Sequence, residues 1–171
     1  MRLKKVVSLL MIIGGMSCAR AHAVPVDATT TLKVGSQLTF THTLTAVKGL
    51  SAGILPKGTP LAQGLISANQ KMKAIQLSWD RTINPQDLLY SGSAGRAALM
   101  RGPGQDIPVE FYYDVSQVLR DPADDTGINI APSIHAQKKF PYSIIVGARG
   151  YLLPLKGGQY KLGVLADVTF A

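Results

Sequence analysis

The most constraining feature of this sequence is a regular alternation in its last fifteen residues, GGQYKLGVLADVTFA. Apolar side chains occupy every second position, and the residues between them are mostly small or polar. A period of two over this length predicts a strand with one face in a hydrophobic core and the other toward water. Chain ends usually fray, so the pattern also predicts that something holds this strand in place. The apolar positions are Tyr160, Leu162, Val164, Ala166, Val168 and Phe170.

Shorter strand patterns fill the rest of the chain, and no segment keeps a helical period beyond about two turns. Alternation is weak over residues 24–34 and strong over 37–47, where threonine is frequent. Glycine and proline recur roughly every ten residues, a spacing typical of an all-β sandwich. Further strands are expected in segments 61–69, 72–80, 107–119, 128–134 and 142–155.

The first 23 residues have the three-part layout of a secretory signal peptide. Arg2, Lys4 and Lys5 precede an apolar run, and the segment closes on Ala21-His22-Ala23. We therefore divide the chain into a signal peptide (1–23), an N-terminal extension (24–36) and one sandwich domain (37–171). The only cysteine of the chain lies in the signal peptide, so the exported protein has no disulfide and depends on its core or on partners for stability.

Composition and motifs argue against catalysis, metal binding and nucleic-acid binding. The chain beyond residue 23 carries 14 basic and 10 acidic side chains and no dense basic face with interleaved aromatics. His42 falls on the apolar face of a strand and Trp79 ends a short strand, so we expect both to pack in the core. The aspartates of the polar loop at 120–127 lack the spacing of a calcium loop. We predict no enzyme, no catalytic residue, no metal and no cofactor.

Several features together resemble subunits of chaperone–usher pili (fimbriae), in particular the disulfide-free Saf and Afa types. Many such subunits have a glycine fourteen residues from the end, alternating apolar positions after it and a penultimate aromatic residue. Gly158, the alternation and Phe170 match this pattern. The segments GLSAG at 49–53 and GTPLAQG at 58–64 also match, whereas residues 81–150 match nothing in the family.

The resemblance implies an immunoglobulin-like β-sandwich that lacks its last strand. A periplasmic chaperone would fill the resulting groove first, and the N-terminal extension of the next subunit would then replace it, at an outer-membrane usher. The donor strand would be Val24, Val26, Ala28, Thr30 and Leu32. The acceptor groove and chaperone-binding surface would be Leu38, Phe40, Leu44, Gly158, Tyr160, Leu162, Val164, Ala166, Val168, Phe170 and Ala171.

The implied function is a structural or minor subunit of a surface fimbria that polymerises by donor-strand exchange, supports adhesion and passes through the periplasm. One alternative is a tip adhesin or invasin of the same fold, which would accept a strand but need not donate one and would contact a host receptor. Another is a monomeric periplasmic binding protein in which residues 24–34 are the first strand of a complete sandwich.

Overall fold

The computed structural model describes residues 26–29, 38–90, 92, 94–147 and 155–171. The predicted signal peptide lies outside these ranges, as do Val24, Thr30 and Leu32 of the predicted donor strand. Among the described residues, no helix has both the length and the apolar character needed to cross a bilayer.

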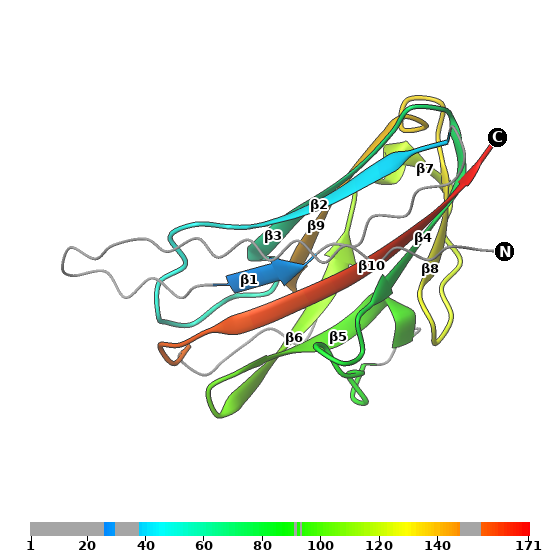
Figure 1. Ribbon diagram of the computed structural model, residues 1–171. Coiled ribbons are helices and arrows are strands. Elements are labelled where there is room, and N and C mark those ends of the chain that lie inside the picture. Colours follow the sequence, from blue (N-terminus) through cyan, green and yellow to red (C-terminus); the bar gives the residue numbers. More distant parts are fainter. Residues whose placement is uncertain (1–25, 30–37, 91, 93, 148–154) are drawn as a thin grey trace, which may run out of the picture.

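The described chain forms two five-stranded sheets that face each other (Figure 1). One sheet has the order β1-β10-β4-β8-β7 and the other the order β2-β3-β9-β6-β5. All strand pairs are antiparallel except β1 with β10. The strands are β1 (Val26–Thr29), β2 (Phe40–Ala46), β3 (Pro60–Ala68), β4 (Met72–Trp79), β5 (Ala97–Gly102), β6 (Gln105–Tyr112), β7 (Val118–Arg120), β8 (Ile128–Pro132), β9 (Lys139–Val146) and β10 (Tyr160–Phe170).

Alternating apolar residues of both sheets meet in one core, as the period-two patterns predict. Trp79 is 2% exposed and stacks on Phe111 with 4.1 Å between the ring centroids, which confirms its expected place in the core. The Phe111 and Tyr142 rings meet in a T-shaped arrangement with 5.9 Å between their centroids, so aromatic side chains from both sheets fill the centre of the sandwich. The all-β sandwich expected from the sequence is confirmed.

One predicted strand ends earlier than its pattern indicated. The alternation after residue 107 continued through Tyr113 and Val115, but β6 stops at Tyr112 and Val115 is 82% exposed. Asp114 caps a short 3₁₀ turn, η2 (Val115–Gln117), by accepting a hydrogen bond of 2.8 Å from the backbone N–H of Ser116. Aspartate competes with the strand ladder in this way, so the chain turns and β7 joins the other sheet.

Candidate functional site: the margin between β10 and β2

The strand that the sequence singled out has different neighbours along its length. β10 pairs with β4 through residues Val164 to Phe170, and with β1 through Tyr160 to Gly163. β2 ends the other sheet and has only β3 as a ladder partner among the described strands. We call the line where these two strands meet, one from each sheet, the β10–β2 margin.

The segment at this margin comes from the N-terminal extension of the same chain. β1 runs parallel to β10 in the register Val26–Tyr160, Asp27–Lys161, Ala28–Leu162 and Thr29–Gly163. β1 also contacts β2 and β3 of the opposite sheet (Figure 1). The described part of the extension therefore lies along the strand edge that the sequence analysis predicted as the acceptor.

Burial along the inward face of β10 is graded. Tyr160, Leu162, Val164 and Ala166 are at most 2% exposed, whereas Val168 and Phe170 are half-buried against the core. Leu165, on the outward face, is 40% exposed. The strand thus presents the two-faced character that its sequence predicted, with the tightest packing in its first half.

The β2 side of the margin contains a buried polar pair. His42 is 3% exposed, and its Nε2 is hydrogen-bonded to the hydroxyl of Tyr142 on β9 at 2.6 Å. Tyr142 reaches across β3 because Gly64 has no side chain; a Cβ at Gly64 would overlap the tyrosine ring. Burial lowers the pKa of His42 to about 4, and burial also raises the pKa of Tyr142. His42 therefore sits in the core as a neutral group, as expected from its place on the apolar face of a strand.

The start of β10 is fixed against the β5–β6 hairpin. Gly158 has φ 151°, and a Cβ there would overlap the ring of Pro103. The Tyr160 ring lies where a Cβ of Gly102 would be, and its hydroxyl accepts a hydrogen bond from Nε2 of Gln105. Glycine at position 158 therefore satisfies two demands, an unusual backbone angle and close contact with the hairpin.

A buried asparagine takes the place of a ladder partner where β4 ends. Asn84 is fully buried, and its Nδ2 donates to the carbonyl oxygens of Leu99 (3.1 Å) and Lys161 (2.9 Å). Its Oδ1 accepts from the backbone N–H of Gly163 at 2.7 Å. These hydrogen bonds hold the segment of β10 that pairs with β1, and they act on the opposite edge of that segment.

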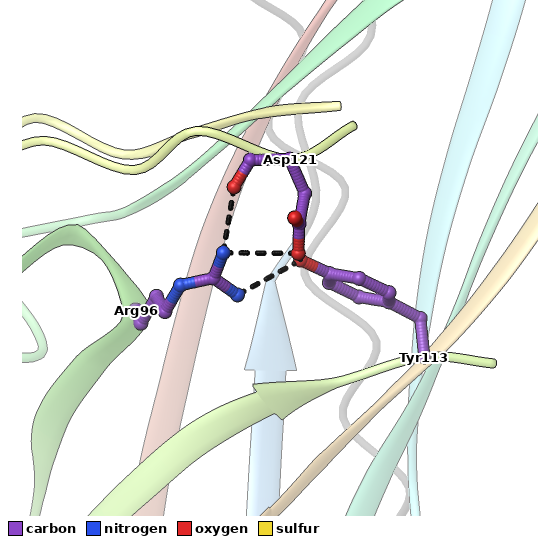
Figure 2. Close-up of polar contacts among 3 residues, drawn as sticks. All are labelled: Arg96, Tyr113 and Asp121. Atoms are coloured by element: carbon purple, nitrogen blue, oxygen red, sulfur yellow. Dashed lines mark hydrogen bonds and ion pairs between the residues drawn. The ribbon is translucent and has the colours of Figure 1, made fainter. Parts of the chain in front are cut away.

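The far end of β5 is joined to the opposite sheet by a three-residue polar cluster (Figure 2). A guanidinium nitrogen of Arg96 donates to the backbone oxygen of Asp121 (2.6 Å) and lies 2.9 Å from its Oδ2, while the Tyr113 hydroxyl donates to the same Oδ2 (2.7 Å). Burial and the hydrogen bond to Asp121 raise the pKa of Tyr113 to about 12. Burial opposes ionisation of Asp121, but its bonds from Tyr113 and Arg96 outweigh this and hold its pKa below the usual value.

The solved structures that this chain resembles are fimbrial proteins. A Salmonella SafD adhesin matches with a TM-score of 0.57 and 20% identity, covering 77% of this chain and 88% of that one. The Escherichia coli Hda pilus minor tip subunit, HdaB, matches with a TM-score of 0.57 and 13% identity, covering 77% and 84%. AggB, the minor subunit of the Escherichia coli aggregative adherence fimbriae type I, matches with a TM-score of 0.52 and 14% identity, covering 77% of this chain and 86% of that one.

The chain has the fold of these fimbrial subunits. No protein-family model matches the sequence, and no curated protein matches it. At these identities the likeness establishes the fold, and the fold agrees with the resemblance found in the sequence.

Among the residues that the sequence analysis assigned to the acceptor groove, the inward positions of β10 form one continuous row. Phe40 is 3% exposed at the start of β2 and Leu44 is half-buried against the core. Leu38, before β2, is 40% exposed, and Ala171 is exposed, with its backbone N–H donating to the carbonyl of Lys71 at 3.0 Å. Within the described residues, no group of three His, Cys, Asp or Glu side chains is arranged to hold a metal ion.

Sequence reasoning missed the side chains that fasten β10 and β5. Asn84 precedes Pro85, a pair that is typical of turns, and nothing local distinguishes a buried turn asparagine from an exposed one. Arg96, Tyr113 and Asp121 are too far apart in sequence to form a motif. Gly64 did carry a usable signal, because an isolated glycine inside a strand pattern indicates a close approach by another group.

Proposed function

We propose that this chain is a structural or minor subunit of a chaperone–usher fimbria, and that it polymerises by donor-strand exchange. The single observation that carries the proposal is the occupant of the β10–β2 margin. The edge of β10 is paired by a segment of the N-terminal extension, the part of the chain that would be donated to a neighbour. The shared fold with fimbrial subunits supports the same conclusion.

The physical reason for exchange is the exposed strand edge that remains without a donor. An unpaired edge presents free N–H and C=O groups, and an apolar row beside it is left in contact with water. A strand from another chain satisfies the ladder and buries that row. Burying ~500 Å² of apolar donor surface at ~25 cal/mol per Å² contributes on the order of 12 kcal/mol before ordering costs, which is enough for joints without covalent links.

The assignment of roles follows the sequence. In this proposal Val24, Val26, Ala28, Thr30 and Leu32 form the donor strand, and the inward row of β10 with Phe40 and Leu44 forms the acceptor. The partners are a periplasmic chaperone, an outer-membrane usher and neighbouring subunits. The protein is exported by its signal peptide, crosses the periplasm and becomes part of a surface fimbria.

A truncation with rescue tests this function. The chain without residues 1–34 is expected to be unstable or aggregated, and a synthetic peptide of residues 24–34 is expected to raise its melting temperature greatly. Grafting residues 24–34 after Ala171 through a short linker should have the same effect within one chain. A scrambled peptide of identical composition is the control. A truncated chain that is already a stable monomer, with no response to the peptide, would contradict the proposal.

A second candidate function, attachment of the fibre to a surface, is favoured by a hollow of about 590 Å³ on the outward face of β2, β3, β9 and β6. Hydroxyl and amide side chains line it together with Leu65 and Pro141, and Tyr112, which also lines it, is 60% exposed. Tyrosine is common at binding surfaces because it joins an apolar ring to a polar tip. Tyr112→Ala should reduce binding of cells that carry the fimbria, while Leu119→Ala, at a position 75% exposed outside the hollow, should not.

A further inference from the structure

We infer that the turn from Asp80 to Asn84 is a positioning element for donor-strand pairing. It takes the place of β4 beside residues 161–163 of β10, and it makes the backbone groups of Tyr160 and Leu162 face the edge where a donor strand pairs. This role rests on the proposed function, and it belongs to a segment that is not itself a strand of the sheet. We call this segment the Asp80–Asn84 turn.

The turn begins where β4 leaves β10. β4 ends one residue before Asp80, and the backbone N–H of Asp80 donates to the carbonyl of Gly163 at 2.9 Å. The side-chain amide of Asn84 then accepts from the N–H of Gly163 at 2.7 Å and donates to the carbonyl of Lys161 at 2.9 Å. The β4-facing edge of β10 therefore stays hydrogen-bonded after β4 has ended, with one side chain in place of a strand.

These hydrogen bonds fix the direction of the backbone groups on the opposite edge. Along a strand, the N–H and C=O groups of successive residues point alternately to the two edges. The groups of Lys161 and Gly163 face the turn, so those of Tyr160 and Leu162 face the other way. That is the edge on which β1 pairs, in the sheet order β1-β10-β4. The turn thus keeps this part of β10 extended, with its pairing groups toward a donor.

The turn does not need a donor to keep its own shape. The Asp80 carboxylate accepts from the backbone N–H and the hydroxyl of Thr82 (3.0 and 2.6 Å), and the Asp80 carbonyl accepts from the N–H of Asn84 (2.7 Å). The next residue is bonded to β5, because the N–H of Leu99 donates to the carbonyl of Pro85 at 2.9 Å. All these contacts join residues of the sandwich itself, so the turn stays in place when a donor enters or leaves.

An ordered edge favours donor pairing because less conformational entropy is lost when the ladder forms. Fixing the backbone of a residue is unfavourable, and a strand that is already held extended on one side has less freedom left to lose. In Asn84→Leu, residues 160–163 lose their side-chain partner on the β4 side, and the donor has to order them itself. Asn84 therefore acts on pairing through β10, without contact with the donor.

The experiment compares Asn84→Leu with a core variant of equal stability, both in the chain of residues 24–171. Ile144→Ala is the control, because Ile144 is fully buried on β9 of the other sheet and makes none of these hydrogen bonds. Ile144→Val replaces it if its urea midpoint matches that of Asn84→Leu more closely. Amide hydrogen exchange is measured at Tyr160 and Leu162, whose N–H groups face the donor edge.

We expect Tyr160 and Leu162 to exchange at least ~100-fold faster in Asn84→Leu than in the stability-matched control. Leu165, which pairs with β4, should exchange at the same rate in both variants. Gly163 does not enter the comparison, because its N–H loses its partner directly in Asn84→Leu. A residue that only stabilised the fold would change all of these amides alike.

A milder variant, Asp80→Ala, tests the same role if Asn84→Leu does not fold. It keeps the asparagine and removes only the carboxylate that holds Thr82 in the turn. Exchange at Leu162 should be ~10-fold faster than in the unmutated chain, as expected for the loss of a supporting hydrogen bond. Asp125→Ala, at an exposed position outside the turn, is the matched control and should leave this rate unchanged.

Two results would overturn the inference. One is equal exchange at Tyr160 and Leu162 in Asn84→Leu and the stability-matched control, and the other is absent protection of these amides in the unmutated chain. Neither result touches the proposed function, which is tested separately by rescue of the truncated chain with the peptide of residues 24–34. Failure of that rescue would count against the function itself, whatever the exchange rates are.

Discussion

The two margins of the sandwich are closed by different means. Along β5, side chains of the same chain form the closure: Arg96 at one end, Asn84 in the middle and the Tyr160 ring against Gly102 at the other end. At the β10–β2 margin, the closure is a main-chain ladder between residues Tyr160 to Gly163 of β10 and β1, which belongs to the N-terminal extension. One margin is fastened by individual side chains, and the other by a strand.

This difference determines what each margin can exchange. Each side-chain contact depends on one residue in one position, so only the folded chain itself can supply it. A backbone ladder is made by N–H and C=O groups that every strand carries, so a strand from another molecule can take the same place. The β5 margin therefore defines the subunit, and the β10–β2 margin is where subunits would join.

The largest effect on stability is expected from Asn84→Leu at the β5 margin. The change removes the amide partner of the partly buried Leu99 and Lys161 carbonyls and of the buried Gly163 N–H. At about 1–3 kcal/mol for each buried polar group left without a hydrogen bond, the free energy of unfolding should fall by about 4 kcal/mol in urea titrations. Gln86→Leu, at an exposed position of the same turn, is the control and should be nearly neutral.

Rescue experiments with Asn84→Leu sharpen the comparison. A peptide of residues 24–34 restores the chain that lacks the extension, in our proposal, but no added peptide should restore the asparagine contacts. If Asn84→Leu lowers the free energy of unfolding by less than about 1 kcal/mol, water or a shifted backbone replaces these hydrogen bonds. That result would contradict the idea that side-chain contacts hold the β5 margin closed.

The next largest effect concerns acid stability on the β2 side. The pKa of His42 is about 4 in the folded protein and 6.5 when exposed, so folding favours the neutral ring. Stability from this group is complete above pH 6.5 and is lost as the pH falls from 6.5 toward 4, by ~3 kcal/mol at most. In the His42→Gln variant, the urea midpoint should change less between pH 6.5 and pH 4 than it does in the unmutated protein. His135→Gln, at an exposed position, is the control and should show the same change in urea midpoint as the unmutated protein.

A smaller effect is expected where β10 begins. Gly158→Ala forces a side chain into an unfavourable backbone region and against Pro103, and we expect a loss of ~2 kcal/mol in the free energy of unfolding. Gly157→Ala is a matched control, because a Cβ at the preceding glycine would meet nothing within 4 Å. Equal melting temperatures for the two variants would contradict the close contact with the hairpin.

The smallest effect on stability is expected at the Arg96 end of the β5 margin, which is partly exposed. The Arg96 and Asp121 side chains are 32% and 38% exposed, so their ion pair is partly screened by water. Asp121→Asn should cost about 0.5–1 kcal/mol, and the cost should shrink in high salt. Asp125→Asn, exposed in the same loop, serves as the control; an equal change there would show that the cluster has no specific role.

The sequence could predict most strands because a period of two reports directly which face is buried. β2, β3, β4 and β10 lie within three residues of their expected bounds, and the core positions of His42 and Trp79 follow from the same alternation. The pattern failed after Tyr112 because apolar residues at Tyr113 and Val115 continued the rhythm while Asp114 turned the backbone. A local hydrogen bond from one side chain outweighed the periodicity.

By itself, then, the sequence determined that the chain folds into two packed sheets, that its last strand has one buried face and that the chain beyond residue 23 has no cysteine to form a disulfide. Only the tertiary structure decided which strands neighbour β10, which margin the Asn84 and Arg96 contacts fasten and where the N-terminal segment lies. The reason is physical. Alternation is a property of neighbours along the chain, whereas ladder partners and side-chain contacts join residues such as Asn84 and Gly163, which become neighbours only when the sheets assemble.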